Sequence, residues 1–156
     1  MSTKYIIVDD ESVAHDIIKK YCSLLPNMQL MQDCYDAIEA IEFLNNHTVD
    51  LIFLDLNMPK LKGFEFLKTL SHSPKVIVTT AYKEHALEGY ELNIVDYLLK
   101  PFSYQQLEER IVRAITNRIA LRKIYVHLFE HDYNNAITEC DKAITSKPEF
   151  AIAAMR

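Results

Sequence analysis

The chain has 156 residues, of which 49% are hydrophobic and 25% charged, and its formal net charge is −5 at pH 7. That length suits one ordinary domain with a short appendage, and the acidic balance disfavours nonspecific binding to nucleic acid. No apolar stretch reaches the roughly 20 residues that cross a membrane, and the N-terminus leads into a strand instead of a signal peptide. We therefore expect a cytoplasmic globular protein.

Predicted strands and helices alternate along the chain. Apolar runs predict strands at 5–8, 28–35, 51–54, 75–78 and 95–99, the second being the weakest. Apolar residues at steps of three and four predict helices at 12–25, 37–44, 63–70, 84–90 and from 104 onward. Expected N-caps are Ser12, Asp36 and Ser103, and Val13, Ile17, Tyr21 and Leu24 mark the expected apolar face of the first helix.

The strand runs are apolar on both faces, which is typical of a parallel sheet covered by helices on each side. The pattern predicts an α/β fold, a doubly wound five-stranded parallel sheet. Right-handed crossovers place the carboxyl ends of the first, third, fourth and fifth strands at one edge. The residues expected to meet there are Asp9, Asp10, Asp55, Thr80 and Lys100.

Three of these residues are acids. Carboxylates held within a few ångströms of one another repel unless a cation lies among them, and Mg²⁺ is the hard divalent ion we expect. The plainer alternative is that Asp9 or Asp10 only caps the following helix. The third acid, Asp55, and the lysine at the same edge favour the metal site.

Five motifs now appear in order: Asp9-Asp10, the run from Asp55 to Pro59, Gly63, Thr80-Ala81 and Lys100-Pro101-Phe102. Together they resemble the receiver domain of bacterial response regulators, over about residues 4 to 118. The resemblance implies a flavodoxin-like (βα)5 receiver at 1–120, followed by a helical extension at 121–156.

In that family the aspartate matching Asp55 accepts a phosphoryl group from a sensor histidine kinase or phosphotransfer protein. The resemblance implies that Asp10, Asp55 and the backbone carbonyl of Asn57 would ligate Mg²⁺, while Asp9 would bind it directly or through water. Lys100 would contribute an ammonium to the acyl phosphate. The protein would catalyse only its own phosphoryl transfer and dephosphorylation, and would not be an enzyme in the usual sense.

Thr80 would hydrogen-bond a second phosphoryl oxygen and act as a switch with Tyr97, whose ring would rotate inward. Thr79 is the rival hydroxyl, but strand alternation sends the two threonines to opposite faces, and the family's hydroxyl directly precedes alanine. The family pattern also implies a cis peptide bond before Pro101. For Gly63 we expect a loop conformation that a side chain would forbid.

Other residues have plainer readings. His15, His47, His72 and His85 lack metal-ligand spacing and are expected at the surface. The cysteines are three and scattered, which indicates neither a disulfide framework nor a zinc site.

Residues 80–101 resemble receivers that precede LytTR-type DNA-binding domains, but only about forty residues follow the receiver here. The tail is neutral, with five basic and five acidic side chains at 121–156. Its Tyr133, Ala136, Ala143 and Pro148 resemble the second helix of a tetratricopeptide repeat, although the first-helix signature is poor. A generic amphipathic hairpin is the alternative.

The expected function is a two-component response regulator whose tail binds a downstream protein or forms a homodimer. The alternative is a DNA-binding transcriptional regulator whose output domain is missing from this chain. A phosphatase of the haloacid dehalogenase type would need an acid where Asn57 stands. Flavin binding would need amide donors where Asp9, Asp10 and Glu11 would repel a phosphate.

Overall fold

The computed structural model describes residues 2–72, 74–82, 94–129, 135, 137–138 and 141–142. The chain forms two compact units, Met1–Val112 and Arg113–Arg156. The expected boundary between residues 120 and 121 stays a prediction. The expected helix at 84–90 and nearly all of the tetratricopeptide-like segment lie outside the described residues.

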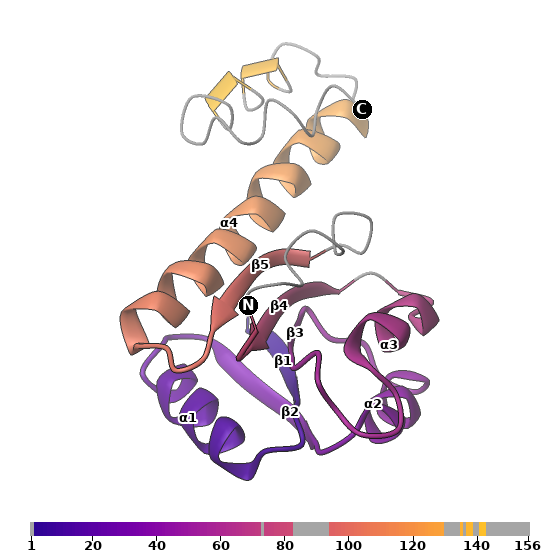
Figure 1. Ribbon diagram of the computed structural model, residues 1–156. Coiled ribbons are helices and arrows are strands. Elements are labelled where there is room, and N and C mark those ends of the chain that lie inside the picture. Colours follow the sequence, from indigo (N-terminus) through magenta and orange to yellow (C-terminus); the bar gives the residue numbers. More distant parts are fainter. Residues whose placement is uncertain are drawn as a thin grey trace. The chain divides into compact units, whose positions relative to one another are not determined.

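The first unit contains a five-stranded parallel sheet in the order β2-β1-β3-β4-β5. Its strands are β1 (Thr3–Val8), β2 (Met28–Cys34), β3 (Leu51–Leu54), β4 (Lys75–Thr80) and β5 (Ile94–Leu99). The helices are α1 (Ser12–Ser23), α2 (Ala37–Leu44), α3 (Gly63–Thr69) and α4 (Tyr104–Phe129). Helix α1 lies on one face of the sheet, while α2 and α3 lie on the other (Figure 1). The predicted doubly wound α/β fold is confirmed.

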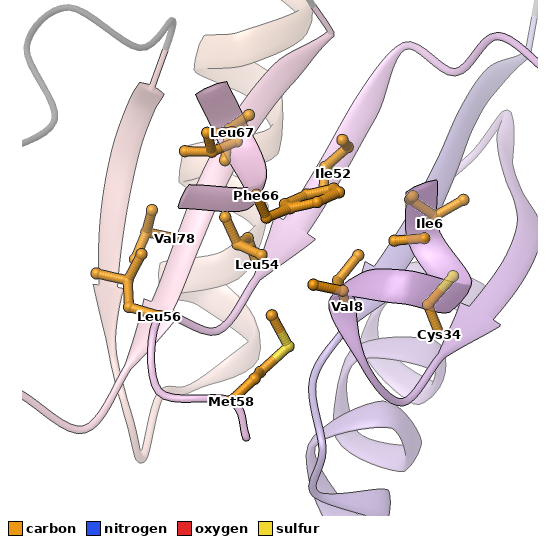
Figure 2. Packing of buried hydrophobic residues seen from close by; sticks show 13 residues of the cluster. Ile6, Val8, Cys34, Ile52, Leu54, Leu56, Met58, Phe66, Leu67 and Val78 are labelled. Carbon is orange, nitrogen blue, oxygen red and sulfur yellow. The ribbon is translucent and has the colours of Figure 1, made fainter. Parts of the chain in front are cut away.

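The central strands are buried on both faces, and every residue of β3 is at most 1% exposed. On the face covered by α2 and α3, Phe66 and Leu67 point toward strands that carry Ile52, Leu54 and Val78 (Figure 2). Full burial of one such side chain stabilises the fold by roughly 1.5–3 kcal/mol. This core therefore holds rigidly the strand ends from which the site is built.

The predicted apolar face of α1 is wrong. The buried residues are Ala14, His15, Ile18 and Cys22. Val13 and Leu24 are instead 65% and 62% exposed. Small side chains at positions 14 and 22 let the helix approach the sheet closely, and a polar histidine joins the buried face because it finds hydrogen-bond partners there. The spacing of the large hydrophobic residues therefore predicted the wrong buried face for this helix.

Two of the three predicted caps are confirmed. Asp36 Oδ1 accepts hydrogen bonds from the backbone N–H groups of Ile38 and Glu39 at the start of α2. Ser103 and Gln106 bond each other's backbone N–H groups at the start of α4. Ser12 is not a cap: it is the first residue of α1, and the N-cap residue before it makes no capping side-chain bond. None of the described helices combines the length and hydrophobicity that crossing a bilayer requires.

Candidate functional site

The register between strands β1 and β3 brings Asp9 and Asp55 together. Val8 and Leu54 are paired across β1 and β3, so the residues that follow them lie side by side. The backbone N–H of Asp55 donates to the Val8 carbonyl at 2.9 Å, and that of Asp9 donates to the Cys34 carbonyl at 3.1 Å. The two aspartates are therefore anchored by the ends of three neighbouring strands.

A cluster of carboxylates results at this edge. One carboxylate oxygen each of Asp9, Asp10 and Asp55 lies within 4.8 Å of the others. Asp9 is fully buried and Asp55 is 6% exposed, whereas Asp10 is exposed. Burial raises the pKa of Asp9 and of Asp55 above the ordinary value, even though Lys100 acts in the opposite direction on both.

Lys100 is shared among several acids. Its Nζ lies 2.7 Å from Asp9 Oδ2, 3.4 Å from Glu11 Oε2 and 3.9 Å from Asp55 Oδ2. Burial by itself would lower the pKa of Lys100, but the hydrogen bond to Asp9 and the surrounding carboxylates outweigh it and raise the pKa. The peptide bond from Lys100 to Pro101 is cis, as the family pattern implied.

One ammonium does not balance the negative charge of this cluster, because four carboxylates, those of Asp9, Asp10, Glu11 and Asp55, gather around or beside it. Oxygen ligands with excess negative charge are the donor set that Mg²⁺ prefers. The residues present fit the predicted ion.

The two threonines at the end of β4 occupy different environments. Thr80 Oγ1 accepts a hydrogen bond from the Tyr82 N–H at 3.2 Å, and the Thr80 carbonyl accepts one from the Lys100 N–H at 2.8 Å. Thr79 is fully buried, and its hydroxyl has no hydrogen-bond partner. The structure thus places Thr80 beside Lys100, as expected, and Thr79 inside the core.

Tyr97 lies on β5, paired with Val78, and its partly buried ring packs against the hydrophobic cluster under α2 and α3. Its pairing partner Val78 lies two residues before Thr80, the last residue of β4. Its role as a switch stays a prediction.

The loop after β3 closes tightly on Asp55. The Asn57 N–H donates to Asp55 Oδ1 at 3.3 Å, and the Gly63 N–H donates to the Leu56 carbonyl at 3.1 Å. A side chain is excluded at Gly63, as expected, but by close packing of the backbone and not by a positive φ angle. A Cβ at this position would lie 2.8 Å from the Asp55 carbonyl oxygen, closer than real Cβ atoms approach.

A hollow of about 480 Å³ opens beside these residues. Its polar lining includes Asp10, Asp55, Asn57 and Lys100. Its apolar lining includes Val13, Ile17, Tyr82, Pro101 and Phe102. Asp55 is therefore reachable from one side of the domain through a partly apolar approach.

His15 does not lie at the surface, where it was expected. It is fully buried, with Nε2 2.7 Å from the Asp9 carbonyl oxygen and Nδ1 2.9 Å from Asp33 Oδ1. The available signal was its spacing of three and seven residues from Ile18 and Cys22, which share its face of α1.

A flavodoxin-like sheet that gathers three acids, a threonine and a lysine at its carboxyl edge is the arrangement expected of a receiver. The family model of the response regulator receiver domain matches residues 5–112, and the chain belongs to this family. It is thus a receiver domain of two-component signalling. Such domains are typically non-enzymatic signalling domains, bind Mg²⁺ through an acidic pocket, and interact with a histidine kinase or phosphotransfer partner.

Protein MrkE of Klebsiella pneumoniae is 36% identical over 115 residues, which cover 72% of this chain and 41% of MrkE. Transcriptional regulatory protein BtsR of Escherichia coli K12 is 32% identical over 117 residues, covering 74% of this chain and 49% of BtsR. The crystal structure of the MrkE response regulatory domain superposes with a TM-score of 0.69 at 32% identity, covering 74% of this chain and 97% of that domain. The chain spans about half the length of these curated relatives.

Proposed function

We propose that this protein is a response regulator that accepts a phosphoryl group on Asp55 from a phosphohistidine of a sensor histidine kinase or phosphotransfer protein. The observation that carries the proposal is the position of Asp55, which lies within the acid cluster, within 3.9 Å of the Lys100 ammonium, and on the wall of an open hollow. A carboxylate oxygen of Asp55 forms the new bond to phosphorus while the bond from phosphorus to the donor's imidazole nitrogen breaks.

The neighbouring residues divide the work. Asp10, Asp55 and the Asn57 carbonyl would hold Mg²⁺, with Asp9 binding it directly or through water. When bound, the ion supplies positive charge that lets the carboxylate and the phosphoryl oxygens approach. Lys100 neutralises a phosphoryl oxygen as a point charge, and the Thr80 hydroxyl donates a hydrogen bond to another. To do so, the Thr80 hydroxyl gives up the hydrogen bond that it now accepts from the Tyr82 N–H. Tyr97 then moves into the space that the hydroxyl has left.

The hollow also fits the approach of a donor protein. Val13 and Ile17 of α1 are 65% and 37% exposed, although both are hydrophobic, and they line the same hollow as Asp55. An apolar surface beside a charged reaction centre supports association with a partner that brings its phosphohistidine to Asp55. Asn57 stands where a phosphatase would need an acid, so we expect no turnover of small phosphate esters.

We propose two alternative ways in which the receiver passes on its signal. The helical extension at 121–156 binds a downstream protein or a second copy of the chain, or the receiver belongs to a DNA-binding regulator whose output domain lies outside this chain. The second candidate is favoured by one observation, that BtsR is a transcriptional regulatory protein about twice as long as the match. A gel shift with random duplex at low salt, negative with and without phosphorylation, would exclude DNA binding by this chain itself.

Acetyl phosphate or beryllofluoride with Mg²⁺ tests the phosphoacceptor. After treatment with acetyl phosphate, mass spectrometry should show one labile phosphoryl adduct, and with either reagent size-exclusion chromatography should show a change in association. Asp55→Asn should abolish both. Asp50→Asn is the matched control, because Asp50 precedes β3 at its opposite end and binds the Lys4 N–H. Retention of the adduct in Asp55→Asn would refute the assignment.

A further inference from the structure

His15 links the acid site to Asp33 on β2 and, through it, to Lys19 on α1. It is fully buried, and Nε2 lies 2.7 Å from the backbone carbonyl oxygen of Asp9. Its other nitrogen, Nδ1, lies 2.9 Å from Asp33 Oδ1, and Lys19 Nζ lies 3.1 Å from Asp33 Oδ2. The chain of contacts therefore runs from Lys19 through Asp33 and His15 to the backbone of Asp9.

The chemistry of the partners determines the direction of these hydrogen bonds. A carbonyl oxygen can only accept, so Nε2 donates to Asp9. Burial by itself would raise the pKa of Asp33, but hydrogen bonds from His15 and Lys19 hold the pKa below its ordinary value, and the carboxylate is ionised at neutral pH. The Asp33 carboxylate lies against Nδ1 and holds that side of the ring. The Tyr35 ring stacks on the imidazole with centroids 4.3 Å apart and restrains its plane.

The carbonyl that His15 binds belongs to the peptide unit joining Asp9 to Asp10. The Asp9 N–H is already bonded to the Cys34 carbonyl, so the backbone of Asp9 is held on both of its polar groups. Rotation about the Asp9 ψ angle would swing this carbonyl and move Asp10 relative to Asp9 and Asp55. The hydrogen bond from His15 opposes that rotation, because breaking it would leave a buried carbonyl without a partner.

We propose that His15 is a positioning residue of the acid site: by bonding the Asp9 carbonyl it orients the Asp9 and Asp10 carboxylates toward a shared Mg²⁺, and Asp33 holds His15 in place. This inference rests on the proposed function. His15 touches neither the ion nor the phosphoryl group, and it acts through the backbone between two ligands.

Titration calorimetry of the full chain with Mg²⁺ tests the proposal. His15→Phe keeps a flat ring beside Tyr35 but removes both ring nitrogens, and the dissociation constant for Mg²⁺ should rise roughly tenfold. His15→Gln retains a donor for the Asp9 carbonyl and should give an intermediate value. Asp33→Asn, which leaves His15 in place but weakens its anchor, should raise the constant about threefold.

His47→Phe is the matched control. His47 also stacks on an aromatic ring, that of Phe43 at 4.3 Å, and donates from Nδ1 to a backbone carbonyl at 3.1 Å, but it follows the far end of α2. Its variant should keep the wild-type affinity. Urea unfolding without Mg²⁺ measures stability separately, since a purely structural role would change stability and leave metal affinity unchanged.

Wild-type affinity in His15→Phe would overturn the inference while leaving the proposed function intact. Should His15→Phe fail to fold, Asp33→Asn decides, and an unchanged dissociation constant there would equally overturn it. A wild-type chain that binds no Mg²⁺ would instead overturn the proposed function, and the inference with it.

Discussion

Lys100 and Asp9 form a direct ion pair, with Nζ 2.7 Å from Oδ2, while the same nitrogen lies 3.9 Å from Asp55 Oδ2. The ammonium is thus held by an acid of the metal site more closely than by the residue proposed to carry the phosphoryl group. A divalent cation entering the cluster would compete with Lys100 for Asp9. Metal binding and the release of Lys100 toward Asp55 should therefore be coupled.

Lys100→Met should separate the two roles of this lysine. Without Mg²⁺ the variant loses the partner of a buried carboxylate and should unfold more easily by about 3 kcal/mol. It should bind Mg²⁺ more tightly, because a competing charge is gone. Phosphorylation by acetyl phosphate should slow by on the order of 100-fold. Lys60→Met, which removes an equal charge from an exposed pair with Asp36, should leave Mg²⁺ binding and phosphorylation unchanged and lower the free energy of unfolding by less than about 1 kcal/mol.

Thr79→Val and Thr80→Val form a matched pair of substitutions on adjacent residues. Because the Thr79 hydroxyl is buried without a partner, its removal should stabilise the fold by about 1 kcal/mol and leave phosphorylation and the change in association intact. Thr80→Val should leave the fold stable but abolish the phosphorylation-dependent change. Urea unfolding and chromatography of the phosphorylated proteins measure both effects. The reverse pattern would assign the switch to Thr79.

Gly63→Ala should disturb Asp55 through the backbone. The added Cβ would meet the Asp55 carbonyl oxygen at 2.8 Å and the Leu56 Cα at 2.9 Å, neither of which is a movable side-chain end. We expect a loss of about 2 kcal/mol in the free energy of unfolding and slower phosphorylation. Lys62→Ala, at the exposed N-cap position just before it, should be close to neutral. Wild-type behaviour of Gly63→Ala would show that the loop shifts freely.

Asp36 should contribute a defined part of the acid sensitivity of the fold. Bonds from the Glu39 N–H and the Lys60 ammonium lower its pKa, so the unfolded chain binds the proton first as the pH falls. Its contribution is present at neutral pH and is lost as the pH drops below about 4 toward the lowered pKa. Asp36→Asn keeps a capping oxygen but cannot ionise. The difference between its free energy of unfolding and that of the wild type should therefore disappear as the pH falls.

The capping role itself is tested by Asp36→Ala, which should cost about 1 kcal/mol at neutral pH because two backbone N–H groups of α2 lose their acceptor. Urea unfolding of the three proteins at several pH values measures both effects. A difference between wild type and Asp36→Asn that grows in acid would contradict the assigned direction of the pKa shift.

Mg²⁺ should stabilise the protein. At a concentration 100 times its dissociation constant, the ion adds about 2.7 kcal/mol to the free energy of unfolding, and a chelator should remove the gain. Asp10→Asn should lose most of this effect. Asp16→Asn removes an equal charge from an exposed position on α1 and should retain it. Thermal unfolding with and without Mg²⁺ provides the measurement, and equal gains in both variants would contradict the site.

Local patterns were sufficient for the order of elements, the parallel sheet and the acids at its edge. Strand runs apolar on both faces and right-handed crossovers leave few arrangements, and each places Asp9, Asp55 and Lys100 at the same edge. The caps at Asp36 and Ser103 also follow from residues within one helical turn. These features depend on residue types and short spacings, which the amino-acid sequence contains directly.

Only the tertiary structure decided which face of α1 is buried, why Gly63 lacks a side chain, and which acid holds Lys100. His15 is buried because Asp33, 18 residues away, and the Asp9 carbonyl satisfy its two nitrogens. A polar side chain enters the interior only where packing supplies partners from other elements, and no local period contains that information. The acids of the site were therefore readable from sequence, whereas the residues that orient them were set by long-range packing.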